Sequence, residues 1–204
     1  MQKSGTNPKR MTAAERRQQI LGHTFNLIRD QGFKTVSMRD IAREAQINEA
    51  LIYRHFPTKE ALLWEVVRGI IDHQPIHSLT PSKDKEDFKA QLQTFVDFYL
   101  EKTLGDPSIL RIILYAVMEN YPLPNEFNFQ KEGTFLNWMY RSIEKGKLEW
   151  GFDQQVDTLV SLSSFMGGLI YFVLQATVLQ LFPKGESSNF KNTYVGLFLK
   201  SLEA

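Results

Sequence analysis

The 204-residue chain contains no cysteine, which excludes disulfides, thiolate metal sites and cysteine nucleophiles. Strand signals are also scarce, because few short β-branched runs alternate with polar residues, and the sequence therefore predicts an all-α fold. The chain begins without the apolar core of about 7–15 residues that a signal peptide needs. We therefore expect a cytoplasmic protein.

Sequence signatures of catalysis are missing as well. There is no G-x-S-x-G elbow, P-loop, H-E-x-x-H helix or glycine-rich dinucleotide fingerprint in the sequence. The isolated histidines His23, His73 and His77 have no convincing metal-binding partners, and we expect them to be structural or exposed. We therefore expect no enzyme activity, no catalytic residue, no metal site and no cofactor.

The charge of the chain is unevenly distributed. The formal net charge is +1. Residues 1–75 carry 12 Lys and Arg against 8 Asp and Glu, a charge of +4, whereas residues 76–204 carry 12 against 15, a charge of −3. A basic first part indicates an anionic partner such as a nucleic acid, although the excess alone is a weak signal.

Local composition, and the positions of proline and serine residues, divide the chain into two domains. Polar residues 1–10 are predicted to form a flexible arm, residues 11–73 a first domain, and residues 74–204 a second, larger one. Prolines and serines place a linker at about 74–84. With 43% hydrophobic residues, both parts together can bury a sizeable core.

Helix-capping residues mark four helices in the first domain. Thr12 begins a capping box, and Gly32 stands where a helix C-terminal glycine belongs. Ser37 and Asn48 are suited to cap the next two helices, and Pro57-Thr58 precedes a helix that runs to about residue 72. The second domain is predicted to contain longer helices at about 86–104, 107–121, 125–146, 156–182 and 189–202.

Residues 35–62 form the most informative stretch. They predict two short helices joined by a turn of three or four residues, which is the size of a helix-turn-helix. Ala42 and Ala45 are small where the helices must cross, and the core between them comes from Ile41, Ile47, Ile52 and Phe56. In such a unit the second helix enters the major groove of DNA.

This stretch resembles the tetracycline-repressor (TetR) family. The matching residues are Arg16-Arg17-Gln18-Gln19-Ile20-Leu21, Gly32-Phe33, Thr35, Ile41-Ala42, Ala45, Tyr53, His55-Phe56 and Lys59-Glu60-Ala61-Leu62. The resemblance implies an N-terminal three-helix, helix-turn-helix DNA-binding domain and a C-terminal helical ligand-binding and dimerisation domain. The chain departs from the family at Gln46, where a turn glycine is usual and a positive φ is required, and at Leu51, where a smaller residue is usual.

The resemblance also implies roles for single residues at the DNA. Tyr53, His55 and Lys59 would hold phosphates, and the groove would be faced by Arg39, Glu49, Ala50, Leu51 and Arg54. The full predicted DNA-binding set is Thr35, Ser37, Arg39, Asn48, Glu49, Ala50, Leu51, Tyr53, Arg54, His55 and Lys59. Three alternatives stay open: Tyr53 as a half-buried core aromatic, His55 as a packing or capping residue, and Arg54 as a solvated surface residue.

The 26 residues between Asp157 and Lys184 carry no formal charge, and about 20 apolar residues suffice to span a bilayer. Polar side chains interrupt this run, which favours a helix buried by its own domain and a second subunit. They are Ser161, Ser163, Ser164, Gln175, Thr177 and Gln180. The resemblance implies dimerisation through the last two long helices, with interface residues Ser164, Gly168, Tyr194 and Phe198. The alternative is a membrane-associated protein anchored by 158–183.

The resemblance further implies a small-molecule cavity in the second domain. Candidate pocket residues are Phe95, Tyr99, Tyr115, Met118, Glu119, Trp138, Phe165 and Tyr171. An aromatic stripe is more often plain core, and Glu119 is equally suited to a helix-end surface.

The sequence thus predicts a ligand-responsive transcriptional regulator, most simply a repressor, that binds a palindromic double-stranded DNA operator as a homodimer. A small apolar effector would release it, and no membrane is involved. The alternative is a soluble small-molecule-binding protein whose helix-turn-helix no longer reads specific DNA.

Overall fold

The computed structural model describes residues 11–72, 81–121, 130, 132–181 and 187–203. Within these ranges the chain forms nine α-helices and no strand, which confirms the all-α prediction. The chain divides into two compact units, Met1–Val67 and Arg68–Ala204. The predicted arm, most of the predicted linker, His73 and His77 lie outside the described residues.

The first unit contains α1 (Ala13–Gln31), α2 (Met38–Glu44), α3 (Glu49–His55) and the beginning of α4 (Lys59–Asp72). Each predicted start signal is present. The hydroxyl of Thr12 accepts from the Glu15 amide at 3.2 Å, and Ser37 forms the same kind of capping box with Asp40. Local hydrogen bonds therefore define the beginnings of these helices.

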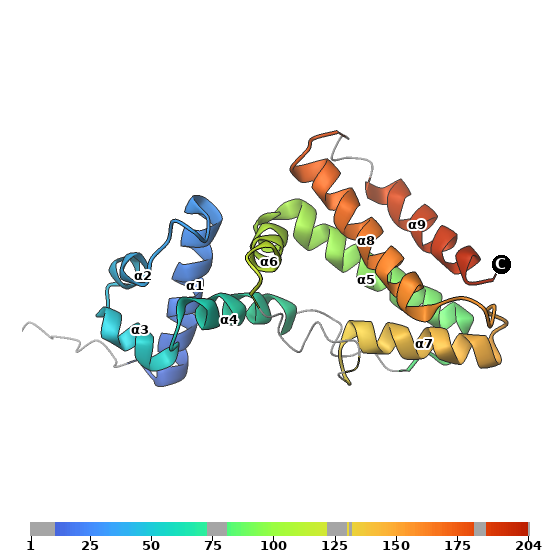
Figure 1. Ribbon diagram of the computed structural model, residues 1–204, viewed down its shortest axis with the longest axis horizontal. Coiled ribbons are helices and arrows are strands. Elements are labelled where there is room, and N and C mark those ends of the chain that lie inside the picture. The colour runs from blue at the N-terminus through green and yellow to red at the C-terminus, as the bar shows by residue number, and fades with distance from the viewer. Residues whose placement is uncertain (1–10, 73–80, 122–129, 131, 182–186, 204) are drawn as a thin grey trace, which may run out of the picture. The chain divides into compact units, whose positions relative to one another are not determined.

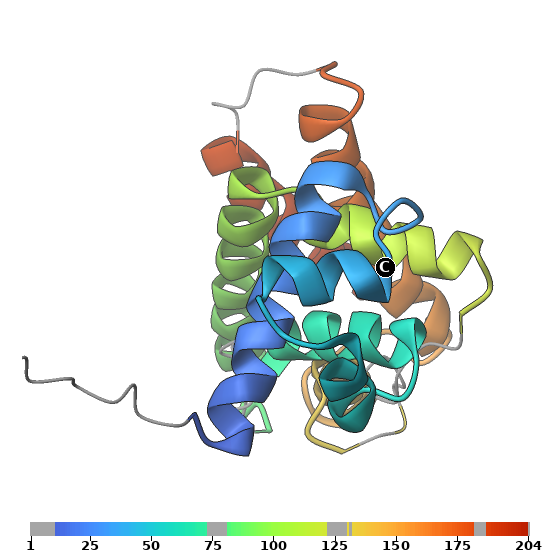
Figure 2. The ribbon, with the colours of Figure 1, turned by 90° about the vertical axis from the view of Figure 1, so that its left-hand side faces the viewer.

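The core of the first unit lies between its helices. α2 crosses α1, as Figure 2 shows, and fully buried Ile20 of α1 faces a cluster of apolar side chains from the other elements. That cluster contains Val36, Met38, Ile41, Ala42, Ile52, Phe56 and Leu62. The residues predicted to fill the helix-turn-helix core are members of it, with Ile47 packed at its margin.

The second unit contains α5 (Lys85–Gly105), α6 (Ser108–Met118), α7 (Phe135–Glu149), α8 (Thr158–Thr177) and α9 (Ser187–Ser201). α5 packs against both α8 and α9, and α7 packs against α8 (Figure 1). The helix predicted from residue 125 instead begins at Phe135, because Thr134 caps it by accepting from the Asn137 amide at 3.2 Å.

Aromatic side chains fill the core of the second unit. Phe95 of α5 stacks on Phe135 of α7 with 3.5 Å between ring centroids. The ring centroid of Phe165 of α8 lies 4.7 Å from that of Phe198 of α9 and 6.5 Å from that of Phe95. These contacts tie all four long helices together and create a core that is rich in flat, polarisable surface.

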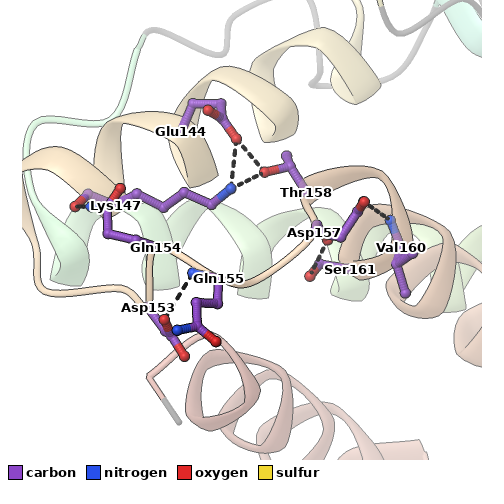
Figure 3. A network of polar contacts seen from close by, with 9 residues as sticks. All are labelled: Glu144, Lys147, Asp153, Gln154, Gln155, Asp157, Thr158, Val160 and Ser161. Atoms are coloured by element: carbon purple, nitrogen blue, oxygen red, sulfur yellow. Dashed lines mark hydrogen bonds and ion pairs between the residues drawn. The ribbon is translucent and has the colours of Figure 1, made fainter.

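A polar network joins the end of α7 to the start of α8 (Figure 3). The buried hydroxyl of Thr158 accepts from Lys147 Nζ at 2.8 Å and donates to the carboxylate of Glu144. Lys147 also pairs with Glu144 at 2.9 Å. The hydrogen bonds from Thr158 and then Lys147 lower the pKa of Glu144, so the network holds the first turn of α8 against α7.

α8 is the one described helix that is long and apolar enough to cross a membrane. Its mean hydropathy is 1.6, and 28% of the apolar stretch is buried within the protein. Length and composition alone are weak evidence for a membrane span, since a core helix of a soluble protein passes the same test.

Candidate nucleic-acid interface

The helix-turn-helix consists of α2, the turn at residues 45–47, and α3. The Ile47 amide donates to the Ala42 carbonyl at 2.9 Å and closes the turn. Gln46, at the centre of the turn, has a φ of 54°, which confirms the predicted left-handed conformation. A side chain with a Cβ is strained there by about 1–2 kcal/mol.

α3 begins with an asparagine cap. The Asn48 side chain accepts from the Ala50 amide at 2.8 Å, so its oxygen is used within the helix end. The predicted DNA-binding set divides by exposure into two groups. The exposed ones are Thr35, Ser37, Arg39, Asn48, Ala50, Tyr53 and Arg54, and the partly buried ones are Glu49, Leu51, His55 and Lys59.

Two exposed arginines on this motif have no partner among the described residues. Among the residues that the structure describes, Arg39 and Arg54 form no ion pair or hydrogen bond, whereas Arg43 pairs with Asp40 at 2.6 Å. The hydrogen bond from the Ser37 hydroxyl lowers the pKa of Asp40 and holds it as a carboxylate. Arg39 and Arg54 therefore keep all of their donors available for an anionic ligand.

Tyr53 and His55 lie near the end of α3 and differ in environment. Tyr53 is 47% exposed and is not among the residues of the apolar cluster of the first unit. The His55 ring is partly buried, with its centroid 6.4 Å from that of Phe56. The packing alternative for His55 is therefore supported by the structure.

Lys59, at the first position of α4, is partly buried, and its ammonium group already contacts Phe33 of the same domain. Its Nζ donates to the Phe33 carbonyl at 2.5 Å and lies 4.2 Å from the centroid of the Phe33 ring. Burial lowers the pKa of Lys59. An ammonium group has three N–H donors, and one of them is used by the Phe33 carbonyl. The predicted phosphate contact of Lys59 therefore has to use the other two.

The geometry is that of a helix-turn-helix with exposed arginines on both of its helices, such as Arg39 on α2 and Arg54 on α3. Comparisons with known proteins agree. Residues 20–66 match the family model described as "Bacterial regulatory proteins, tetR family". This part of the chain is similar to the TetR family.

Relatives and solved structures extend this result. The chain is 36% identical over 67 residues to the HTH-type transcriptional regulator HbdR of Aromatoleum sp. (strain CIB), covering 33% of this chain and 28% of that protein. It is 28% identical over 137 residues to the HTH-type transcriptional repressor KstR2 of Rhodococcus jostii (strain RHA1), covering 67% of this chain and 65% of that protein. The matches thus span less than two thirds of these relatives.

The fold of a TetR-family structure extends over nearly the whole chain. A TetR-family transcription regulator from Marinobacter aquaeolei VT8 superposes with a TM-score of 0.68 at 20% identity, covering 92% of this chain and 95% of that one. At this level of identity the likeness shows the fold alone. The named relatives are transcriptional regulators, which is a non-enzyme class.

The residues predicted for a TetR-family effector pocket are not all brought together. Phe95, Trp138 and Phe165 are buried in the aromatic core, and Tyr99 packs against it. Tyr115 is partly buried and Glu119 is exposed. Met118 is 82% exposed at the end of α6, and Tyr171 is 56% exposed on α8. The pocket prediction therefore rests on the four residues in or against the aromatic core, which are Phe95, Tyr99, Trp138 and Phe165.

The predicted dimer residues also separate into two groups. Ser164 is exposed on α8, together with Ser163 and Gly167. Gly168 instead faces Tyr194 of its own chain, and a Cβ built there would lie 2.9 Å from two ring carbons of that tyrosine. Phe198 is buried in the aromatic core. The helical phase of α8 places Gly167, one residue earlier, on the open side.

Sequence reasoning did not assign roles to two residues of α1 that contact the helix-turn-helix. Arg17 donates to the carbonyl of His55, and Gln19 donates to the carbonyl of Ala45 at 3.4 Å. Both lie within the segment that carried the family resemblance, but the pattern of that segment did not reveal which groups they bind.

Proposed function

We propose that this protein is a homodimeric, ligand-responsive transcriptional repressor that binds a palindromic DNA operator through α3. The observation that carries the proposal is a helix-turn-helix on which Arg39 and Arg54 are exposed, with no partner in the described part of the chain, beside an exposed Tyr53. Arginine presents a donor fork that matches guanine edges and phosphates. Tyr53 adds a hydroxyl for the phosphate backbone.

The proposed dimer uses the open faces of α8 and α9. Val160 is 63% exposed and Leu197 is 61% exposed, and the small residues Ser163, Ser164 and Gly167 lie exposed on the same helix as Val160. Small residues let a second helix approach closely, and exposed apolar side chains gain stability when they are buried. A second copy of the chain is the occupant that would also give an operator with two-fold symmetry.

The proposed effector site lies in the core of the second unit. The hydroxyl of Tyr99 and the Oε1 atom of Gln91, both on α5, are buried and have no hydrogen-bond partner among the described residues. Burial raises the pKa of Tyr99, so the hydroxyl stays protonated and can donate. A buried unpaired polar group destabilises by about 1–3 kcal/mol, and an apolar effector with one polar group would satisfy it.

Release follows from a shift between conformations. An effector that binds more tightly to the conformation with the wrong spacing of the two recognition helices lowers operator affinity. Such a regulator meets its operator in the cytoplasm, and we place the protein there.

The test is fluorescence anisotropy with labelled DNA from upstream of the protein's own gene, compared with scrambled DNA of equal length at two salt concentrations. We expect selective, salt-sensitive binding in which Arg39→Ala reduces discrimination by about 1–3 kcal/mol. Arg29→Ala, which removes the same charge at the far end of α1, is the matched control. Equal binding to both DNAs by the wild type would instead support the alternative of a small-molecule-binding protein whose helix-turn-helix no longer reads specific DNA.

A further inference from the structure

Arg17 contacts three different groups at once. Its Nη1 donates to the carbonyl of His55 at 3.0 Å, and its Nη2 lies 2.8 Å from the carboxylate of Glu65. Its Cζ lies 4.3 Å from the centroid of the Phe56 ring. One side chain of α1 therefore joins the end of α3 to α4.

The chemistry of the helix end explains why a guanidinium is suited to this place. His55 is the last residue of α3, and the last carbonyls of a helix have no partner within it and carry a partial negative charge. The planar fork of arginine donates to that carbonyl and to a carboxylate while its face stacks on an aromatic ring. Lysine cannot make all three contacts.

α3 depends on contacts of this kind for its orientation. It has seven residues, and a helix that short is not stable by itself in water. Its first turn is capped by Asn48, and Phe56, the residue that ends it, is 1% exposed. The direction in which Leu51 and Arg54 point is therefore determined by what holds the two ends of α3.

We propose that Arg17 is a positioning residue that sets the orientation of α3 for operator recognition and does not contact DNA. This rests on the proposed function, because it needs an operator to be read. Arg17 acts through the His55 carbonyl and Glu65, and its loss lets the end of α3 move away from α1 and α4. Weaker binding to the operator follows, while the same phosphates stay bound.

The competing explanation is a direct phosphate contact, since the Arg17 side chain is 36% exposed. The two explanations differ in salt dependence. Removing the side chain that binds one phosphate lowers the slope of log K against log salt concentration by about 0.9. A positioning residue changes affinity at every salt concentration and leaves that slope unchanged.

The first experiment measures operator affinity at four salt concentrations by fluorescence anisotropy, with helix content and urea unfolding recorded for each variant. For Arg17→Gln we expect an affinity about tenfold lower, the order of one charge-assisted hydrogen bond, at an unchanged slope. Arg16→Gln is the control, because the Arg16 side chain bonds only Gln19 of the same helix among the described residues, and its loss removes the same charge. A slope lower by about 0.9, or unchanged affinity in a folded Arg17→Gln protein, would overturn the proposal.

A second variant decides the question by the sign of its effect. Glu65→Gln removes a negative charge from the DNA-binding domain, so general electrostatics predicts tighter binding to DNA. Through Arg17 we expect the opposite, an affinity about threefold lower, the order of one partly exposed ion pair. Glu44→Gln, which removes the same charge from α2, is expected to bind equally or more tightly.

This variant also carries the test if Arg17→Gln fails to fold. Tighter or unchanged operator binding by Glu65→Gln would refute the positioning role. A wild-type protein that selects no DNA sequence refutes the proposed function, which is a separate result from either variant's.

Discussion

Replacing Gly168 with alanine is expected to lower the stability of the second unit. A Cβ at this position would lie 2.9 Å from two ring carbons of Tyr194 and closer still to its hydroxyl. That hydroxyl donates to the Phe165 carbonyl at 2.5 Å, so the ring cannot move without losing a hydrogen bond. The close approach of α8 and α9 therefore depends on glycine at position 168, which has no side chain.

The magnitude follows from three opposing effects. Overpacking costs about 1–3 kcal/mol, and the displaced hydrogen bond adds about 1 kcal/mol. Alanine returns about 1 kcal/mol through its higher helix propensity. The net expectation is a free energy of unfolding lower by about 1–3 kcal/mol.

The measurement is urea unfolding followed by tryptophan fluorescence, to which Trp138 and Trp150 of the second unit contribute. Gly22→Ala is the control, because Gly22 is exposed in α1 with nothing within 4 Å of a built Cβ, and it should gain about 1 kcal/mol. The double variant with Tyr194→Leu should lose less than the sum of the single changes.

Two outcomes would refute this reasoning. A Gly168→Ala protein as stable as the wild type would mean that Tyr194 does not occupy the space beside the glycine. A variant whose protomer is fully stable but whose dimer dissociates would mean that Gly168 faces the partner subunit, as the family resemblance implied. Sedimentation at several protein concentrations separates the two.

Three further expectations concern the turn, the cap and a tyrosine. Gln46→Gly should raise the free energy of unfolding of the first unit by up to about 1 kcal/mol, because the left-handed conformation strains glutamine; a loss of stability in urea unfolding would contradict this. Asn48→Ala should lower it by about 1 kcal/mol, since the Ala50 amide loses its acceptor; equal urea midpoints would show that the cap contributes nothing. Burial raises the pKa of Tyr194 to about 12 from 10.0. The stability that comes from keeping Tyr194 protonated is fully present below pH 10 and is lost as the pH rises toward the folded-state pKa. The free energy of unfolding, followed by circular dichroism, should therefore decline less over this range in Tyr194→Phe than in the wild type. Equal declines would contradict the raised pKa of Tyr194.

Local rules predicted the first unit well. The capping box at Thr12, the caps at Ser37 and Asn48, and the positive φ that the family resemblance implied for Gln46 are all present. The three caps depend on residues within four positions of one another, where side-chain chemistry decides the backbone conformation. This is also the part of the chain that carried the family resemblance.

Predictions about the second unit depended on helical phase and were less complete. Phe95, Trp138 and Phe165 are buried together, whereas Met118 and Tyr171 are exposed. A helix that is apolar on nearly every side gives no periodic signal to say which face meets a neighbouring helix. Burial along α8 therefore could not be read residue by residue from the pattern.

The sequence by itself determined the helical class, the helix starts in the first unit and the presence of a helix-turn-helix, because these follow from local hydrogen bonds and apolar spacing. Only the tertiary structure showed that Gly168 accommodates Tyr194, that Lys59 bonds the Phe33 carbonyl, and that Arg17 joins α3 to α4. Each of these contacts joins residues that are far apart in the chain. Their partners are chosen by how the helices pack, and no local pattern contains that information.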